Sequence, residues 1–238
     1  MIYALIIAFL VIWSLFIYNK IRNHQLQSFY LKGLTSYVFI LIYGYGFFHY
    51  IVKQDLLGDN VLLEVNNLKI IILIGIGLVL GLIGDLFLEV QYFYPNRKTL
   101  QIRYGMLVFL IGHCFYIAAL SISIGFNYWS LLVGIIMVVI IYFGSKLMNI
   151  NFKNLAAMTY IYTLVIFTMV GMSVFQAIEL GFNNQSTLFF IGALLFGISD
   201  LVLAPIYFQN QTGKFFTIAN LSTYYFGQAL IALSIMFI

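Results

Sequence analysis

Charge is what this sequence has least of. Only 8% of its 238 residues are charged, eleven Lys and Arg and seven Asp and Glu, whereas 63% are hydrophobic. In a typical soluble globular domain, about a quarter of all residues are charged. The composition therefore excludes a soluble fold and predicts an integral membrane protein that is solvated by lipid.

Cysteine is almost absent as well. The single cysteine, Cys114, lies inside an apolar run, which excludes an intrachain disulfide framework and a Cys-based metal site. The sequence also has no zinc-binding histidine pair, phosphate loop or serine nucleophile elbow. The net charge of +4 does not point to nucleic acid, because the basic residues occur singly or in pairs between apolar segments.

The apolar residues fall into eight segments that are separated by polar interruptions. Each is close to the ~20 residues that a membrane span requires, and in lipid such segments must be helical, because an unpaired backbone amide is costly there. We therefore predict an all-α membrane protein whose eight transmembrane helices form one bundle, with residues 1–238 as a single transmembrane domain. The first segment lacks a basic region and a cleavage site, so we interpret it as a retained span. The approximate spans are 2–18, 34–52, 69–90, 104–125, 127–147, 155–178, 186–208 and 217–238.

The basic residues are unevenly divided between the two sides of this bundle. Nine of the eleven follow odd-numbered segments: Lys20, Arg22, Lys32, Arg97, Lys98, Arg103, Lys146, Lys153 and Lys214. The other side has only Lys53 and Lys69, in a loop that also carries Asp55, Asp59 and Glu64. The positive-inside rule then predicts that both termini lie outside the cytoplasm, and the short loops favour a bacterial inner-membrane protein.

The two halves of the chain share a weak pattern at an offset of 115 residues. Asp85 stands in Gly-Asp-Leu-Phe-Leu and Asp200 in Ser-Asp-Leu-Val-Leu, and Gly112-His113 and Gly227-Gln228 follow at the same distance from each aspartate. Four spans per half is an even number, so a true repeat would consist of two parallel four-helix units with the aspartates at equivalent depth.

Asp85 and Asp200 are the leading candidates for a functional site. An ionisable group inside a span costs roughly 2.5 kcal/mol or more, which makes it a functional hypothesis by default. The structural alternatives are that Asp85 pairs with Arg97 or Arg103 near the interface, and that Asp200 is a hydrogen-bonding group in the bundle. Two acids in one low-dielectric cavity are expected to leave one proton donor and one anion at neutral pH.

Other polar residues of the spans are candidates for a supporting role. Glu89 shares a helix face with Asp85 and either extends the site or ends the span at the interface. His113 and Tyr116 lie one turn apart, although a lone histidine in a bundle is more often structural. Asn220, Tyr224 and Gln228 form an i, i+4, i+8 stripe that must face the bundle interior, where it lines a cavity or joins helices.

Small residues precede both aspartates, Gly77 with Gly81 and Ala193 with Gly197. This spacing favours close helix packing. It would also let the two acid-bearing helices approach each other.

Four motifs together resemble the YhhN family, which includes the lysoplasmalogenases. They are Gly84-Asp85-Leu, Leu-Val-Phe-Leu-Ile-Gly-His113-Cys-Phe-Tyr116, Phe196-Gly-Ile-Ser199-Asp200-Leu-Val-Leu-Ala and Tyr224-Tyr-Phe-Gly-Gln228-Ala-Leu-Ile. Their order over spans three to eight makes the match more specific than any one motif, and the N-terminal region has no distinctive motif.

The resemblance implies an intramembrane ether hydrolase that cleaves the vinyl ether bond of a lysoplasmalogen, releasing a fatty aldehyde and a glycerophospho-base. Asp85 and Asp200 would be the catalytic acid and base, in an order left open, with Glu89, His113, Tyr116, Ser199, Tyr224 and Gln228 in binding or supporting roles. Lysophospholipid and membrane lipids are the expected partners, and no metal or organic cofactor is needed for this chemistry.

Two other functions remain open at this stage. An intramembrane aspartyl protease also sets two aspartates in neighbouring helices, although Gly-Leu-Ile-Gly before Asp85 and Ser199 before Asp200 depart from its motifs. A proton-coupled transporter of lipids or small molecules would use the repeat and both acids as proton relays without covalent chemistry.

Overall fold

The computed structural model describes residues 1–57, 61–209 and 213–238, and of residues 54–57 and 61–64 it describes the backbone only. Asp55, Asp59 and Glu64 of the expected acidic loop lie outside the residues whose side chains are described. The described chain contains helices and no strand. The long helices are α1 (Ile2–Ile21), α2 (Gln25–Leu57), α3 (Val61–Val90), α4 (Lys98–Ile124), α5 (Tyr128–Leu147), α6 (Ala156–Glu179), α7 (Asn184–Phe208) and α8 (Lys214–Ser234). Three 3₁₀ turns accompany them: η1 (Pro95–Arg97), η2 (Lys153–Leu155) and η3 (Ile235–Phe237).

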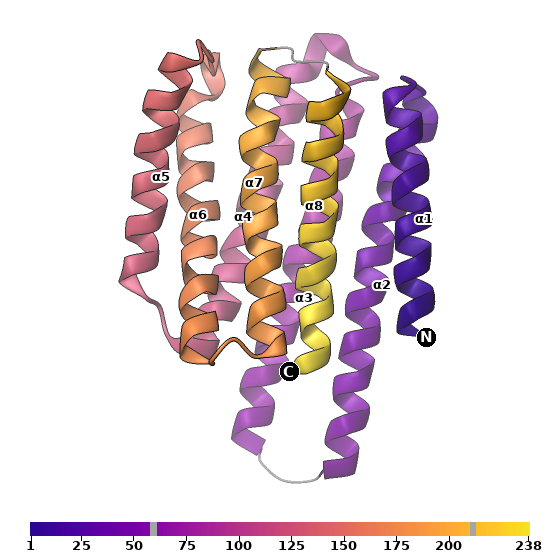
Figure 1. Cartoon of the computed structure of the whole chain (residues 1–238), viewed down its shortest axis with the longest axis vertical. Helices are drawn as coiled ribbons and strands as arrows, with labels where there is room; N and C mark the ends of the chain where they lie inside the picture. The colour runs from indigo at the N-terminus through magenta and orange to yellow at the C-terminus, as the bar shows by residue number, and fades with distance from the viewer. Residues whose placement is uncertain (58–60, 210–212) are drawn as a thin grey trace.

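The eight helices stand side by side, and successive helices run in opposite directions (Figure 1). Both termini lie at the lower end of the bundle in this view. We call the opposite end, where α1, α3, α5 and α7 end and α2, α4, α6 and α8 begin, the basic end. It carries most of the lysines and arginines, as the distribution of charge along the sequence predicts.

Seven of the described helices, α1 to α7, are long and apolar enough to cross a membrane. The eighth predicted span, α8, is not among them. Its 21 residues suffice in length, but Asn220, Tyr224 and Gln228 lower its hydropathy, and all three are buried. An all-helical membrane bundle is therefore confirmed. The polar stripe makes α8 too polar to be recognised as a span by its hydropathy.

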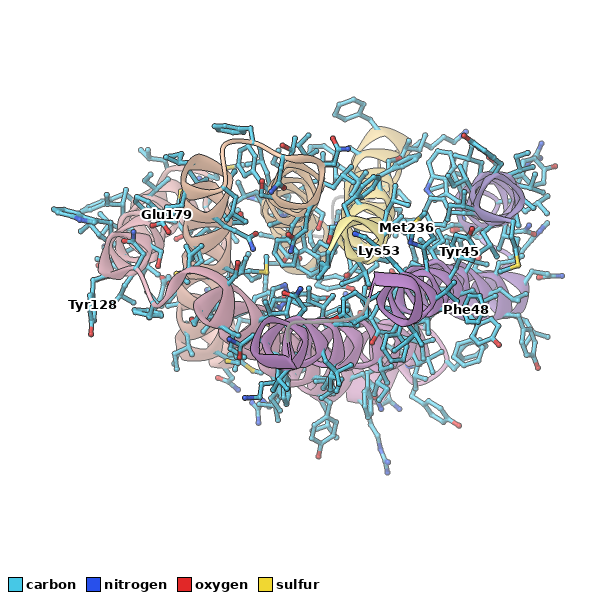
Figure 2. The ribbon with its side chains drawn as sticks, turned by 90° about the horizontal axis from the view of Figure 1, so that it is seen from below. Tyr45, Phe48, Lys53, Tyr128, Glu179 and Met236 are labelled. Carbon is cyan, nitrogen blue, oxygen red and sulfur yellow. The ribbon has the colours of Figure 1, made fainter. Side chains whose placement is uncertain are left out.

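Large apolar side chains cover the outside of the bundle. Phe48 is 62% and Tyr128 80% exposed, and both point outwards in the view along the helices in Figure 2. Leu, Ile and Val residues are exposed on every helix from α1 to α7. An outer surface of this kind is compatible with lipid and not with water, which agrees with the composition.

Glycines set the closest helix contacts, and they do so at equivalent positions in the two halves. A Cβ on Gly112 of α4 would lie 3.3 Å from the carbonyl oxygen of Gly77 in α3. A Cβ on Gly227 of α8 would lie 2.8 Å from the carbonyl oxygen of Gly192 in α7. Both pairs are related by the offset of 115 residues. Small residues let backbones approach in this way.

The acid-bearing helices α3 and α7 do not pack closely against each other, whereas α8 packs against both. The small residues before the aspartates serve other contacts: Gly81 faces Gln228 of α8, and Gly197 faces Phe167 and Val170 of α6. The expectation that these residues bring α3 and α7 directly together is therefore not met, because Gly81 and Gly197 face α8 and α6 instead.

Candidate active site

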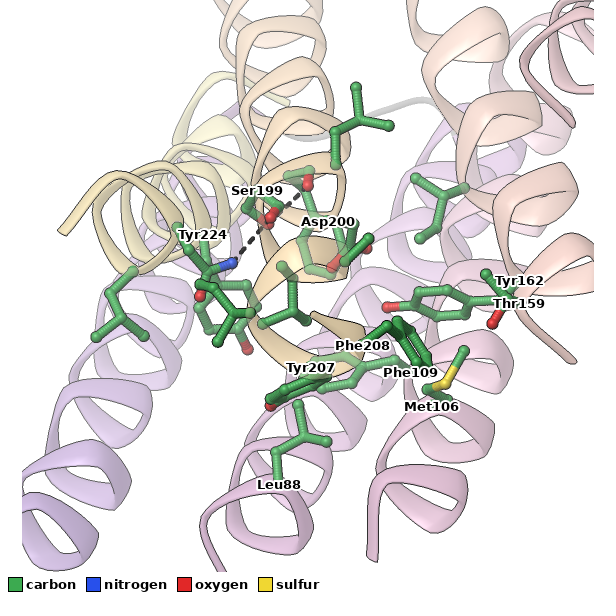
Figure 3. A pocket seen from close by; sticks show the side chains of 18 of the residues that line it. Leu88, Met106, Phe109, Thr159, Tyr162, Ser199, Asp200, Tyr207, Phe208 and Tyr224 are labelled. Carbon is green, nitrogen blue, oxygen red and sulfur yellow. Dashed lines mark hydrogen bonds between the residues drawn. The ribbon is translucent and has the colours of Figure 1, made fainter. Parts of the chain in front are cut away.

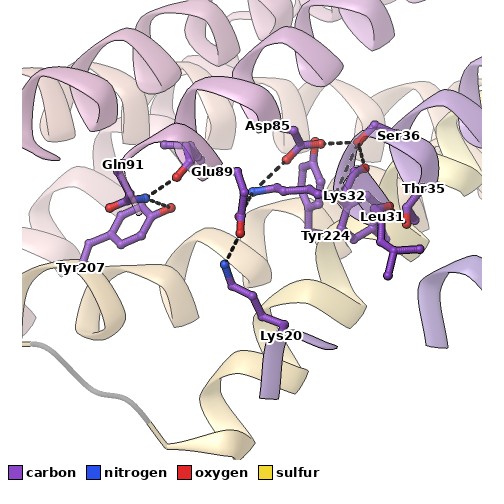
Figure 4. A network of polar contacts seen from close by, with 12 residues as sticks. Lys20, Leu31, Lys32, Thr35, Ser36, Asp85, Glu89, Gln91, Tyr207 and Tyr224 are labelled. Atoms are coloured by element: carbon purple, nitrogen blue, oxygen red, sulfur yellow. Dashed lines mark hydrogen bonds and ion pairs between the residues drawn. The ribbon is translucent and has the colours of Figure 1, made fainter. Parts of the chain in front are cut away.

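A buried ionic cluster joins the first three helices at the basic end (Figure 4). Lys32 Nζ of α2 lies 3.5 Å from Asp85 Oδ1 and 3.5 Å from Glu89 Oε2, both on α3. Lys20 of α1 makes a further ion pair with Glu89. The Lys32, Asp85 and Glu89 side chains are at most 7% exposed. Two ammonium groups and two carboxylates therefore balance one another in a low-dielectric environment, where an unpaired charge would be costly.

Lys32 corrects two expectations from the sequence. The loop after the first span was expected to contain it, but α2 begins at Gln25, so Lys32 lies inside the helix and is buried. Asp85 pairs with Lys32, and not with Arg97 or Arg103. Glu89, the residue before the last of α3, is 2% exposed and ion-paired, so it belongs to the cluster.

Asp85 has hydrogen-bond donors in addition to this ammonium group. The Ser36 hydroxyl of α2 and the Tyr224 hydroxyl of α8 each donate to Asp85 Oδ2, at 2.7 Å. Ser36 follows Lys32 at i+4, so the same helix face supplies both groups. An ammonium ion and two hydroxyl donors together stabilise a carboxylate in its ionised form.

Asp200 has a different environment. It lies on α7 and is only partly buried, but its Oδ2 atom is shielded and has no hydrogen-bond partner. No lysine or arginine among the residues described makes an ion pair with it. The Tyr162 ring of α6 points towards the Asp200 carboxyl in Figure 3, and the two groups interact electrostatically. Asp200 is thus a carboxyl group without a counter-ion.

Both aspartates line one cavity. It is partly open to the surroundings, and its lining is mostly aliphatic and aromatic. Lys20, Lys32 and Glu89 also line this cavity, which we call the inner cavity, as do Tyr162 and Tyr224. The predicted convergence of the two carboxyls on one space is therefore present, with apolar walls such as Leu88, Met106 and Phe109 around it (Figure 3).

The polar stripe of α8 connects the two acid-bearing helices. Asn220 Nδ2 donates to the Ser199 carbonyl oxygen of α7 at 2.8 Å, next to Asp200 in the chain. One turn later, Tyr224 donates to Asp85 of α3. The stripe therefore faces the interior, and α8 fixes the position of one acid relative to the other.

His113, Tyr116 and Gln228 are not among the residues that line the inner cavity. They form a separate buried layer, in which the Tyr116 hydroxyl donates to Gln228 Oε1 at 2.9 Å and the His113 ring packs against Phe196 at 4.4 Å. His113 Nδ1 lies 2.5 Å from the Phe109 carbonyl oxygen. The structure therefore places three of the predicted supporting residues outside the lining of the inner cavity, and brings Glu89, Ser199 and Tyr224 to the cavity wall.

Sequence reasoning missed Lys20, Lys32, Ser36 and Tyr162 as members of the site. The two lysines were interpreted only as orientation signals, and nothing local distinguishes a buried lysine from a loop lysine. The i, i+4 spacing of Lys32 and Ser36 was the available signal. Within the described residues no three His, Cys, Asp or Glu side chains are grouped as they would be for a metal ion. The cluster instead combines acids with ammonium and hydroxyl groups, an arrangement suited to proton transfer.

Comparison with known proteins places the chain in a family. Residues 56–235 match the YhhN family, and this range contains both aspartates, Glu89 and Tyr224. A "Lysoplasmalogenase homolog" from Dictyostelium discoideum is 29% identical over 211 residues, which cover 74% of this chain and 67% of that protein. No solved structure matches the chain significantly. Because the family match covers most of the sequence, the chain belongs to the YhhN family.

Proposed function

We propose that this protein is an intramembrane hydrolase that cleaves the vinyl ether bond of a lysoplasmalogen to give a fatty aldehyde and a glycerophospho-base. Membership of the YhhN family and the similarity to a protein named as a lysoplasmalogenase homolog support a hydrolase of this type. The observation that carries the proposal is the meeting of Asp85 and Asp200 on one largely apolar cavity. Such a cavity suits a single lipid chain, with the acids beside its polar end.

The different surroundings of the two acids support different roles for them. Lys20 and Lys32 balance the charges of Asp85 and Glu89, so the cluster is neutral when all four groups are ionised. Asp200 has no such cation, and an isolated ionised carboxylate inside a membrane protein is costly enough that it takes up a proton. We therefore assign Asp200 as the proton donor and Asp85 as the carboxylate.

The reaction then proceeds in two stages. Asp200 donates its proton to the β-carbon of the vinyl ether, which produces an oxocarbenium ion that the Asp85 carboxylate stabilises. A water molecule adds to this cation and passes a proton to Asp85, so that a hemiacetal forms. In the second stage Asp85 returns that proton to the departing glycerol oxygen, while Asp200 accepts the hemiacetal hydroxyl proton. Aldehyde and alcohol leave, both acids regain their initial states, and one water is consumed.

Release of aldehyde from a lysoplasmalogen by the purified protein tests this proposal. We expect Asp85→Asn and Asp200→Asn each to lower kcat by at least ~100-fold, the usual minimum for loss of a general acid or base. His113→Gln is the matched control, because His113 is buried outside the inner cavity. Near-normal turnover in either aspartate variant that keeps the wild-type melting temperature would remove that residue from the mechanism. No turnover by the wild-type protein would refute the activity.

The same experiment separates hydrolysis from the two other functions considered. Product formation in detergent requires no membrane gradient, whereas a proton-coupled transporter needs a sealed vesicle. A transmembrane peptide offered in place of the lipid tests for the protease. Cleavage of the peptide, or transport without product, would overturn the proposed activity.

We also propose that α8 is an eighth span and that the chain is a parallel repeat of two four-helix units. Support comes from the packing of α8 along α7 and from the matching glycine contacts of α3 with α4 and of α7 with α8. By the positive-inside rule, the basic end would then lie in the cytoplasm and both termini outside, and the short loops favour a bacterial inner membrane. Accessibility of a cysteine introduced beyond Phe237 to a membrane-impermeant reagent tests this orientation.

A further inference from the structure

A second cavity opens at the basic end of the bundle, beside the inner cavity. It is lined by Lys98 and Thr99 at the start of α4, by Asn151 and Lys153 of the α5–α6 connection, and by Tyr207 and Phe208 at the end of α7. Phe152, Tyr207 and Phe208 belong to the walls of both cavities. A ligand that occupies the inner cavity can therefore extend past these three side chains into the second one, which we call the outer cavity.

The charged residues that line the outer cavity, Lys98 and Lys153, are both cationic. Lys98 and Lys153 make no ion pair in the described part of the chain, and no acidic residue lines the cavity. The acids of the basic end, Asp85, Glu89 and Asp200, all lie on the inner cavity. In the ionic cluster of the inner cavity the lysines are paired with carboxylates. The two ammonium groups of the outer cavity have no such partner, and an anionic ligand would neutralise their charge.

The backbone around the outer cavity also favours an anionic ligand. Neither α4 nor α6 has a side-chain cap at its N-terminus, and the first turn of α4 and the η2 turn before α6 both line the cavity. The Asn151 side chain accepts a hydrogen bond from the Lys153 backbone nitrogen at 2.9 Å, which fixes this connection beside the cavity. Helix N-termini favour anions, phosphate in particular.

We propose that the outer cavity binds the phosphate group of the lysophospholipid, with Lys98 and Lys153 as its ligands. This proposal rests on the proposed function, because it assumes that the inner cavity takes the lipid chain. The short glycerol backbone would then pass Tyr207 and Phe208, and the ether oxygen would lie beside the two aspartates. Lys98 and Lys153 thus become specificity-determining residues that distinguish a phospholipid from a neutral lipid with the same vinyl ether.

A pair of substrates tests the proposal: a lysoplasmalogen and the corresponding 1-alkenylglycerol, which lacks the phosphate. We expect the wild-type protein to have the lower KM for the lysoplasmalogen. Lys98→Gln combined with Lys153→Gln should raise this KM about tenfold, the loss expected for two ion pairs that solvent screens in part, and leave hydrolysis of the alkenylglycerol unchanged. Lys146→Gln is the matched control, since Lys146 lies at the same end but lines neither cavity. A double variant that keeps the wild-type preference overturns the proposal.

Binding measurements keep this test independent of catalysis. If the wild-type protein hydrolyses neither substrate, the proposed function fails, but binding of a spin-labelled 1-alkyl lysophospholipid still reports on the outer cavity. The double variant should then bind this lipid about tenfold more weakly and bind the alkylglycerol as before. Inorganic phosphate alone distinguishes the sources of the anion. Saturable phosphate binding that the double variant loses, without any effect on lipid binding, would assign the site to free phosphate and overturn the assignment to the lipid.

Discussion

The two acid-bearing helix pairs, α3–α4 and α7–α8, share a packing scaffold and differ in their electrostatics. The glycine contacts Gly77–Gly112 and Gly192–Gly227 occupy positions related by the offset of 115 residues, as do Asp85 and Asp200. Asp85 has a lysine and two hydroxyl donors around it, whereas Asp200 has a buried oxygen atom without a hydrogen-bond partner. Ala204 stands where the first half has Glu89. Similar helix packing can therefore present two chemically different carboxyl groups to one cavity.

The difference arises from the neighbouring helices. In the first half, α1 and α2 contribute Lys20, Lys32 and Ser36 to the acid-bearing helix. In the second half, α6 presents Tyr162 to Asp200, and no charged side chain. The YhhN match begins at residue 56, so the three residues that complete the Asp85 environment lie before it. The first two helices thus determine the charge state of a site whose acids lie elsewhere in the chain.

Removal of the Lys32 ammonium group should have the largest effect on the difference between the two acids. Lys32→Met leaves two buried carboxylates with one lysine, so one of them must take up a proton, and the two acids of the cavity become alike. We expect kcat to fall by about 100-fold and the free energy of unfolding by about 3 kcal/mol, the usual cost of breaking a buried ion pair. Kinetics and denaturation in detergent measure the two effects.

Lys20→Met is the matched control for this prediction, because Lys20 pairs with Glu89 and does not contact Asp85. Its effect on kcat should be clearly smaller than that of Lys32→Met. Equal losses in the two variants would mean that Lys32 has no special relation to Asp85.

Alanine substitutions at the glycine contacts test whether the helices of the two pairs, α3–α4 and α7–α8, pack equally closely. A Cβ on Gly192 would lie 2.7 Å from the Gly227 carbonyl oxygen, which is backbone and cannot move aside. A Cβ on Gly77 would lie 2.3 Å from the Tyr116 ring, which can shift only by disturbing its hydrogen bond to Gln228. We expect Gly192→Ala and Gly77→Ala each to cost about 2 kcal/mol of stability through overpacking.

Gly44→Ala provides the control for the glycine variants. A Cβ at Gly44 of α2 would meet nothing within 4 Å, so this substitution should stabilise the helix by a few tenths of a kcal/mol up to about 1 kcal/mol. Thermal unfolding of the three variants in the same detergent measures the contrast. A Gly192→Ala protein as stable as the wild type would show that α7 and α8 are not held at this contact.

The smallest expected effects come from the two tyrosines beside the acids. Tyr224→Phe removes a donor to the ionised Asp85, and should lower kcat about tenfold, because a hydrogen bond to a charged group is worth roughly 1.5 kcal/mol or more. Tyr162→Phe removes a hydroxyl group near the protonated Asp200 and should change kcat only about threefold, in keeping with a neutral contact. Steady-state rates of both variants decide this, and the reverse order would contradict the assignment of proton donor and carboxylate.

The sequence by itself determined the class of the protein, the helices and the two acids. Low charge and repeated apolar segments leave lipid as the only compatible solvent, and in lipid the backbone must form helices. The aspartates could be recognised because an acid in an apolar segment is rare, and the stripe of α8 because its period is that of a helix. These are local properties, and local properties can be read along the chain.

Only the tertiary structure decided which groups surround each acid. Lys32 and Asp85 are 53 residues apart in the sequence, and a lysine near the end of a span satisfies the positive-inside rule whether it is buried or exposed. His113 and Gln228 follow Phe109 and Tyr224 at i+4 on α4 and α8, yet they lie one turn farther from the basic end and do not line the cavity. The physical reason is that partner choice in a bundle depends on how α8 and α2 pack against α3, and no single segment encodes that packing.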